Sequence, residues 1–599
     1  MTGVIAGLVT NYPRAYGQFD RWAADPDYGG RLDVGDLDLT GKRNHILRVA
    51  LDALPAPDRQ LLSLLALLSE ATDYDTIKAL NPHVPAEPAS APRRPEGGWD
   101  WKYLSARKRA ARVMYAAEMK AYQGYLEAHR AWERSPERAL VAQRLDRTVA
   151  DLEKRGLLQV DRGTSRYDLH PVVRSVAAAW LPADDRDRLG QRVIDHFSSR
   201  PQNPYEEADT LDDLQNGLTV VRTLLHLGRL PDAYDAYKGD LSHALLYYLE
   251  AYNEILALLR PFFTHGWNTP SPDLAELAQS YLANDAGIVL SQLGEYDQAL
   301  AAKSAGLNID LDRQDWDNVR IALSNCTWDL YGQNRLAPAR RLRVLALELA
   351  EHLGNWRLSD AWEDMYAVYV DSGRMGDAER MWAALNSRGL DGQWAVDIPG
   401  HAALLHARYL FEQGTLTDDD LSRVVQIATA KRHRQSVREL HRLRGWWLAD
   451  HGQWAAAADS LSDAVRMARE ADITDADADA LLALARHHLG QLADPRAEAE
   501  RLAALRQPAH LHLAHLWHAL GDTDEATTHA LAAYRHAWAD GEPHVHRHDL
   551  NRATTLLRTL GAEIPDLPAY NPADDPPPDW ETRAATAIHD LLRQDDNQG

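Results

Sequence analysis

Histidine is the residue type best suited to chemistry in this chain, which contains 26 histidines among 599 residues. Two groups of them lie close together in the sequence: His512, His515 and His518 in one, and His544, His546 and His548 in the other. Neutral imidazoles bind zinc and nickel, so both groups are candidate metal ligands. No further ligand set converges on either group in the sequence, and a chain so rich in histidine produces such groups by chance. We therefore expect no metal site.

A phosphate-binding loop would identify the chain as an ATPase. The nearest string runs from Gly35 to Arg43, and it has five residues between its glycines, one more than the motif allows. Arg43 stands where the motif needs a Ser or Thr to bind magnesium, and the aspartates around Gly35 would repel phosphate. The chain also has no Gly-x-Ser-x-Gly and no His-Glu-x-x-His motif. We expect no ATP hydrolysis, no cofactor bound by this chain alone and no enzymatic activity.

Charge and cysteine content narrow the class of protein. A net charge of −23 argues against a general binder of nucleic acid or of anionic membranes, since both need a basic surface. The single cysteine, Cys326, cannot form an internal disulfide, which fits a reducing compartment. The apolar start from Met1 to Thr10 lacks a preceding Lys or Arg, and no apolar run reaches the ~18 residues of a membrane span. We expect a cytoplasmic protein without a membrane partner.

The elements that would position these residues are helices almost throughout, because Ala, Leu and charged residues dominate the composition. Residues 45–80 are predicted to be helical, 81–98 to form a loop, and 100–134 to form a helix whose basic first half is typical of a solvated face. Strands are predicted at Leu157–Val160 and Tyr167–Leu169, between a helix ending near Gly156 and one starting at Pro171. This order is that of the C-terminal half of a winged helix-turn-helix.

A glycine recurs through the second half of the chain, with a large or apolar residue two places later and a small residue five places later. The clearest members are Gly228 with Ala233, Gly294 with Tyr296 and Ala299, Gly373 with Ala378, Gly452 with Ala457, and Gly521 with Ala526. Gly332 is a weaker member, with a two-residue shift to Leu336 and Ala339. Intervals of about 31 to 41 residues indicate stacked helical hairpins. Glycine would allow each turn, the aromatic residue would fill the gap between helices, and alanine would let them approach closely.

The unit from Gly287 to Leu307, with small residues at Gly287, Ala299 and Gly306, resembles the tetratricopeptide repeat. The resemblance covers about residues 215–560. Such arrays are scaffolds whose concave face binds peptides or small ligands. The expected fold is therefore mainly α, with a winged-helix-like domain followed by a tetratricopeptide-like α-solenoid.

Residues 40–180, followed by the repeats, resemble the C-terminal part of the signal-transduction ATPases with numerous domains (STAND), the class that includes NB-ARC proteins. Leu152–Leu158 and Tyr167–Arg174 carry this resemblance. It implies that His170 senses the phosphates of bound ADP, although Leu169 and Pro171 depart from the Met-His-Asp form of the motif. Because this chain lacks the phosphate loop, ADP or ATP would require a nucleotide-binding domain supplied elsewhere.

Four parts are expected: a remnant of a small helical domain at 1–40, a winged-helix-like domain at 41–200 with an inserted loop and basic helix at 81–134, a repeat solenoid at 211–560, and a linker with a short C-terminal helix at 561–599. The resemblance implies a non-enzymatic sensor or scaffold, which binds a protein or peptide through its repeats and relays this through the winged helix. The alternative is a transcription regulator of the same broad family, acting on DNA through the winged helix.

Overall fold

The computed structural model describes residues 51–68, 70–84, 106–179, 183–354, 358–387, 400–430 and 432–596, with a few isolated positions before residue 51. The expected domain remnant at 1–40 and the string from Gly35 to Arg43 lie almost entirely outside the described residues. The chain divides into two compact units. Unit 1 contains Met1–Pro201 and Asn216–Arg229, and unit 2 contains Gln202–Gln215 and Leu230–Gly599.

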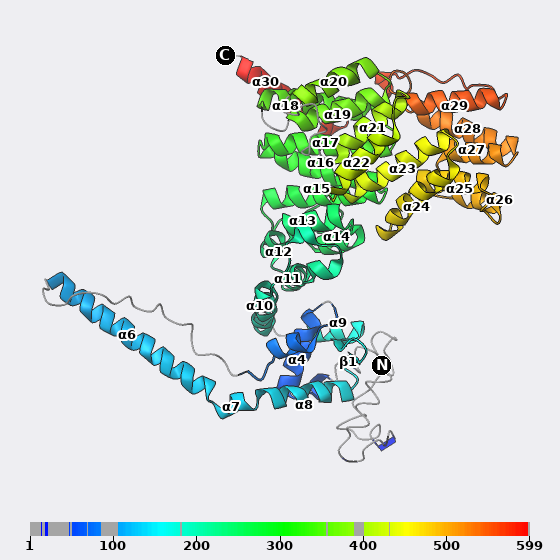
Figure 1. Cartoon of the computed structure of the whole chain (residues 1–599). Helices are drawn as coiled ribbons and strands as arrows, with labels where there is room; N and C mark the ends of the chain where they lie inside the picture. The colour runs from blue at the N-terminus through cyan, green and yellow to red at the C-terminus, as the bar shows by residue number, and fades with distance from the viewer. Residues whose placement is uncertain are drawn as a thin grey trace. The chain divides into compact units, whose positions relative to one another are not determined.

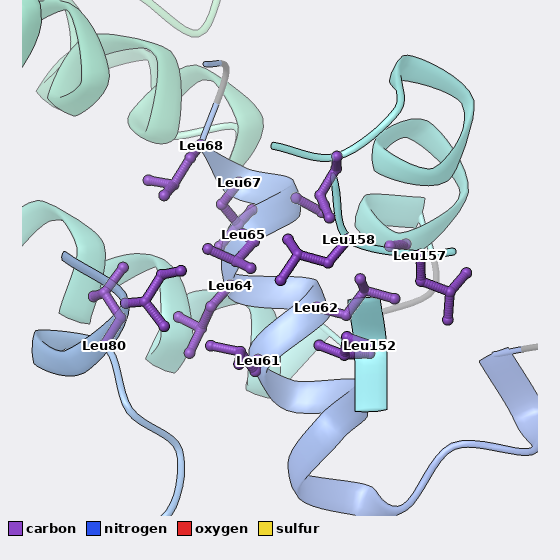
Figure 2. Packing of buried hydrophobic residues seen from close by; sticks show 14 of the residues in the cluster. Leu61, Leu62, Leu64, Leu65, Leu67, Leu68, Leu80, Leu152, Leu157 and Leu158 are labelled. Atoms are coloured by element: carbon purple, nitrogen blue, oxygen red, sulfur yellow. The ribbon is translucent and has the colours of Figure 1, made fainter. Parts of the chain in front are cut away.

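Unit 1 is organised around the leucine-rich helix α4 (Ala56–Leu67). Every residue of this helix from Leu61 to Leu67 is buried. Figure 2 shows leucines of α4 between Leu80 on one side and Leu152, Leu157 and Leu158 on the other, and all of these side chains are buried. A helix that is apolar around most of its circumference must be covered on several sides, which is why α4 forms the centre of this core.

Further elements of unit 1 follow α4 along the chain. They are α5 (Tyr74–Ala79), α8 (Val141–Lys154), β1 (Gln159–Asp161), β2 (Arg166–Asp168), α9 (Pro171–Ala179) and α10 (Ala183–Ser199). Strands β1 and β2 are antiparallel, with Val160 opposite Tyr167. Thr72, between α4 and α5, adds a third short strand position, because it exchanges two backbone hydrogen bonds of 2.8 Å with Tyr167. The hairpin is therefore attached to the start of the unit as well as to its end.

Two helices, α6 (Ala106–Glu133) and α7 (Pro136–Ala139), lie between α5 and α8. Helix α6 matches the helix expected within 100–134, and none of residues 117–133 is buried. The side chains of the basic residues from Arg107 to Arg112 lie outside the described part, so the solvated-face interpretation stays a prediction.

Helix α11 (Gln215–His226) belongs to unit 1 although it was expected to open the repeat solenoid. Arg222 on α11 forms an ion pair of 2.7 Å with Glu70, and Arg229 donates a hydrogen bond of 2.7 Å to Gln191 on α10. The Leu227 side chain lies against Gly190, where a Cβ atom would be only 2.6 Å away. The chain thus passes from unit 2 into unit 1 and back around α11.

Unit 2 consists of helices stacked in sequence order. It opens with α12 (Leu230–Tyr237), α13 (Asp240–His243), the π-helical turn η4 (Ala244–Tyr248) and α14 (Tyr252–Leu259). Short 3-10 turns are η2 (Tyr205–Glu207), η3 (Leu211–Leu214), η5 (Arg260–Phe262) and η6 (Pro572–Asp574). Figure 1 shows α15 to α18 as successive layers after this opening segment.

The repeats are pairs of consecutive helices that pack on each other. The pairs are α15 (Glu276–Gln292) with α16 (Tyr296–Asp312), α17 (Trp316–Gly332) with α18 (Leu336–Leu353), α19 (Leu358–Asp371) with α20 (Met375–Ser387), α21 (Gly400–Glu412) with α22 (Asp418–Ala430), α23 (Arg434–Asp450) with α24 (Trp454–Glu470), α25 (Ala476–His488) with α26 (Pro495–Ala503), and α27 (His510–Ala519) with α28 (Thr523–Trp538). Helix α29 (Arg547–Thr559) follows. The mainly α fold with tetratricopeptide-like repeats is confirmed. None of the described helices combines the length and apolarity that a membrane crossing needs.

The recurring glycines lie in the turns between helices. Positive φ angles, which favour glycine, occur at Gly228, Gly294, Gly373, Gly452 and Gly521. The alanines five positions later are fully buried, namely Ala233, Ala299, Ala378, Ala457 and Ala526. Each pair therefore closes through a left-handed turn residue and a side chain small enough for close helix contact.

Gly332 differs from the other recurring glycines, because it is the last residue of α17 and not the turn residue. Asn334 takes the left-handed conformation there, with φ of 61°. A Cβ atom at Gly332 would lie 2.3 Å from the Tyr296 ring, so this glycine makes room for the aromatic residue of the preceding repeat. The two-residue shift in the sequence pattern reflects this exchange of roles.

The C-terminal segment returns to the first repeats. Helix α30 (Asp579–Asp596) packs against α16 and α18, and its Ala584 and Ile588 are fully buried in their core. Arg341 on α18 forms ion pairs of 2.6 Å with Asp575 and with Glu581. The expected short C-terminal helix is thus an integral part of unit 2.

Candidate functional site: a polar centre on the first helices of the repeats

The first helices of the later pairs, together with α29, carry polar side chains that approach one another within unit 2. We call this group the polar centre; it consists of Asp371, Arg408, Glu412, Arg442, Asp450, Asp475, Asp477, His512, His548, Asp549 and Arg552. They come from α19, α21, α23, α25, α27 and α29, or from the residue that caps α25. Because each helix supplies only one to three of them, the stacking of the repeats is what gathers them.

Arg408 on α21 connects three helices. Its guanidinium lies 2.7 Å from Asp371 on α19 and 3.0 Å from Glu412 on its own helix. The nearby charge of Asp371, more than any other group, raises the pKa of Arg408, and Asp549 on α29 adds to this. Glu412 is only 2% exposed, and burial raises its pKa to about 7 despite Arg408. This carboxyl can therefore change its charge near neutral pH.

Arg442 on α23 makes an equivalent contact with the start of α25. One terminal nitrogen lies 3.2 Å from both carboxylate oxygens of Asp475, which also accepts a hydrogen bond from the backbone of Ala478 and so caps α25. Asp477 lies two residues after Asp475, in the first turn of α25, and its side chain is 52% exposed. Protein atoms nevertheless crowd this carboxyl, and the loss of bulk hydration raises its pKa to about 6.

Arg552 on α29 joins the end of the array to its middle. It donates to both oxygens of Asp450 on α23 and, over 2.7 Å, to the imidazole of His548. Its guanidinium also lies 4.8 Å from the centre of the Trp446 ring. The imidazole that accepts from Arg552 must be neutral, and burial lowers the pKa of His548 to about 4. Helix α29 is thereby held against α21 and α23.

Three further contacts join turns of the first half of unit 2 to later repeats, and the partners follow the same order along the chain on both sides. Glu250 before α14 forms a buried ion pair of 2.5 Å with Arg438 on α23. Glu295, in the turn before α16, forms an ion pair of 2.6 Å with Arg506 after α26. Asn334 donates to the backbone of His536 over 2.8 Å. The second half of unit 2 therefore runs alongside the turns of the first half.

In the described part of the chain, no three His, Cys, Asp or Glu side chains are placed to share an ion, and the two histidine groups make other contacts. His512 is 4% exposed, and burial lowers its pKa to about 3 while its ring packs edge-on against Trp446. His546 forms a hydrogen bond of 2.9 Å with Asn334, and its ring stacks on His536. Both imidazoles serve packing between repeats.

His170, the expected nucleotide-sensing residue, lies at the N-terminus of α9 and is exposed. Its Nδ1 accepts a hydrogen bond of 3.3 Å from the backbone N–H of Val172, so the imidazole caps the helix. Arg174, one turn later, pairs with Asp168 and donates to the Leu65 carbonyl on α4 over 3.3 Å. The imidazole is therefore held at a helix end that is itself tied to the core of unit 1.

The polar centre is the feature that sequence patterns missed. The recurring glycine and alanine positions mark packing, and they carry no group that could bind a partner. Single charged residues such as Arg408 and Arg442 carry no periodic signal, since each meets its carboxylate partner only because its helix stacks beside the next one. The sequence feature that could have indicated the polar centre is the presence of Arg and Asp on helices that also carry the buried residues of the repeat.

No family model matches the sequence, and no curated protein is significantly similar to it. Among solved structures, the chain is similar to a Signal Transduction ATPase with Numerous Domains (STAND) protein with a tetratricopeptide repeat sensor from Pyrococcus horikoshii. The two are 11% identical with a TM-score of 0.40, over 93% of this chain and 72% of that chain.

Proposed function

We propose that this chain is a non-enzymatic sensor and scaffold, the regulatory part of a signalling ATPase, and that it binds a protein or peptide segment at the polar centre. The observation that carries the proposal is the exposure of charged groups there: the side chains of Asp477 and Arg408 are 52% and 41% exposed. Charged side chains that solvent reaches are also within reach of a charged partner.

The polar centre contains more carboxylates than guanidinium groups, and this excess sets the chemistry of the partner. Asp371, Glu412 and Asp549 surround the single guanidinium of Arg408, and Asp477 has no arginine within hydrogen-bond distance in the described part of the chain. A partner segment that brings Lys or Arg would complete these pairs. We therefore expect a basic peptide segment, whose binding weakens as salt concentration rises.

Relay to the rest of the protein would proceed through α11. We infer that the core of unit 1, with its α4, α5, α8 and β1–β2 order, is a winged helix. Helix α11 packs within this unit and continues directly into α12 of unit 2. A change in the repeats that pulls on α12 would therefore act on α11 and on its contacts with Glu70 and Gln191.

Nucleotide would enter only through another domain. His170 offers an imidazole at the N-terminus of α9, where a phosphate would be favourably placed. The chain alone is expected to bind neither ATP nor ADP in equilibrium dialysis. If a nucleotide-binding domain is added in trans, His170→Ala is expected to weaken the ADP-bound complex.

The test of the binding proposal uses the full chain, because α30 is part of the repeat core. Immobilised protein is incubated with a cell extract, retained proteins are identified by mass spectrometry, and the capture is repeated with Asp477→Asn and Asp479→Asn. Asp479 lies on the same helix but outside the polar centre, is 16% exposed, and is the control. Loss of one retained protein in Asp477→Asn alone supports the proposal. Retention that is equal in both variants, or no specific retention by the natural chain, contradicts it.

DNA binding through the winged helix remains the alternative. Helix α8, in the position of a recognition helix, contains Arg144, Arg147 and Lys154 but also Asp146, Asp151 and Glu153. A helix with balanced charge is a poor match for phosphates. Salt-dependent binding of the full chain to duplex DNA would favour the alternative.

A further inference from the structure

A cavity of about 340 Å³ lies between α24 and α25, and no residue of the polar centre lines it. Its cationic lining comes from Arg466 and Arg469 on α24 and Arg486 on α25. Its apolar lining comes from Val465 and Leu482, which are 4% and 5% exposed. In a chain with a net charge of −23, three guanidinium groups around one cavity form a local positive site.

The one carboxylate in the lining is already engaged. One oxygen of Glu470 accepts a hydrogen bond of 2.9 Å from Arg466, and the other accepts one of 2.6 Å from Arg434. Hydrogen bonding to Arg466, and then to Arg434, lowers the pKa of Glu470, so this carboxylate stays charged and paired. Arg466 is occupied in turn by Glu470 and by Asp463 over 3.0 Å.

The other two arginines keep their donors available. Arg469 has its nearest carboxylate, Asp479, at 3.9 Å, which is too long for a hydrogen bond, and its side chain is 74% exposed. Arg486 is exposed and makes no hydrogen bond or ion pair with any residue in the described part of the chain. Guanidinium groups bind carboxylates through paired N–H donors, and two of them can hold one carboxylate from both sides.

We propose that this cavity binds an organic carboxylate with an apolar tail, the carboxylate between Arg469 and Arg486 and the tail against Val465 and Leu482. A single negative charge fits better than a phosphate, because Glu470 lies in the same wall and repels a second charge. The cavity shares no residue with the polar centre, so this proposal and the proposed function can fail separately.

The test is calorimetric titration of the full chain with octanoate, and with octanol, octylamine and inorganic phosphate as comparison ligands. We expect octanoate to bind with one site per chain and the other three to bind at least tenfold more weakly. Octanol binding as tightly as octanoate would overturn the role of the arginines, and phosphate binding as tightly would overturn the role of the apolar wall.

Two variants complete the test. Arg469→Gln with Arg486→Gln is expected to weaken octanoate binding at least tenfold, while thermal unfolding stays unchanged because both side chains are exposed. The matched control is Arg380→Gln on α20, which is 75% exposed, pairs with Asp377 outside the cavity and should leave binding unchanged. Unchanged affinity in the double variant would place octanoate elsewhere and overturn the proposal; the single variant Arg486→Gln gives the same decision if the double variant unfolds.

Discussion

Lys303 on α16 lies 2.9 Å from Asp329 on α17, and neither side chain is more than 1% exposed. The ammonium also donates to Ser291 over 2.7 Å and to the carbonyl of Asn325 over 3.0 Å, so three oxygen atoms surround it. It lies directly beneath Gly287, where a Cβ atom would be 2.5 Å from the lysine stem. The small residue that marks the best repeat unit is small because it makes room for this buried pair.

Lys303→Met should destabilise unit 2 strongly, because it keeps the volume of the side chain and leaves Asp329 buried without a cation. We expect a loss of about 3–5 kcal/mol in the free energy of unfolding, measured by denaturant titration. The double variant Lys303→Met with Asp329→Leu should recover much of the loss, since no charge is then buried. Equal losses in the single and double variants would contradict this account.

Gly332→Ala tests the exchange of roles between Gly332 and Asn334. The added methyl group would clash with the Tyr296 ring, and overpacking of this kind costs about 1–3 kcal/mol. Gly294→Ala should cost about 1–2 kcal/mol for a different reason, its left-handed backbone, because no atom lies near its Cβ position. Tyr296→Leu should reduce the cost of Gly332→Ala and leave that of Gly294→Ala unchanged in thermal melts of the combined variants.

Asp285→Asn should change the pH dependence of stability. Asp285 is 8% exposed and accepts a hydrogen bond of 3.1 Å from the Tyr237 hydroxyl. Burial raises the pKa of its carboxyl from 3.8 to about 7. A carboxyl whose pKa is raised on folding favours the folded state at low pH, and that contribution is lost as pH rises from about 4 to about 7. The shift corresponds to stability on the order of 4 kcal/mol. Unfolding free energies across this range should fall less steeply in Asp285→Asn, and as steeply as before in a variant of the exposed Asp459.

Ile588→Ala tests whether α30 is part of the repeat core. Ile588 is fully buried among residues of α16 to α18, so its truncation should cost about 2–5 kcal/mol. The control is His589→Ala at the neighbouring position, where the side chain is 51% exposed. It should change the free energy of unfolding by no more than about 0.5 kcal/mol. A negligible effect of Ile588→Ala on the thermal midpoint would show that α30 is not docked in solution.

Cys326 provides a chemical readout of the same core. It is fully buried in the cluster that contains Ile588, and burial raises the pKa of its thiol to about 12. Because the thiolate is the reactive form, the native protein should not react with iodoacetamide at pH 8, whereas the denatured chain should take up one equivalent. Labelling of the native protein, followed by mass spectrometry, would contradict the burial of Cys326. Labelling should become faster in Ile588→Ala.

The sequence by itself determined the parts of this protein that depend on local chemistry. Gly294 and Gly373 mark turns because only a residue without a Cβ adopts positive φ easily, and Ala299 and Ala378 mark helix contacts because a larger side chain would not fit. The order of helix and strands from α8 to α9 followed from alternation, turn residues and Pro171 in the same way. His170 could be placed at a helix start, and its role beyond capping stays a prediction.

Only the tertiary structure decided which distant residues meet. Nothing near Ile588 in the sequence indicates α16 or α18, nothing near Arg408 indicates Asp549, and α11 carries a repeat-like turn glycine yet packs in unit 1. These contacts depend on the summed curvature of many stacked helix pairs, to which each repeat adds a small rotation. Local patterns specify each hairpin, but the surface that the hairpins enclose exists only once they are stacked.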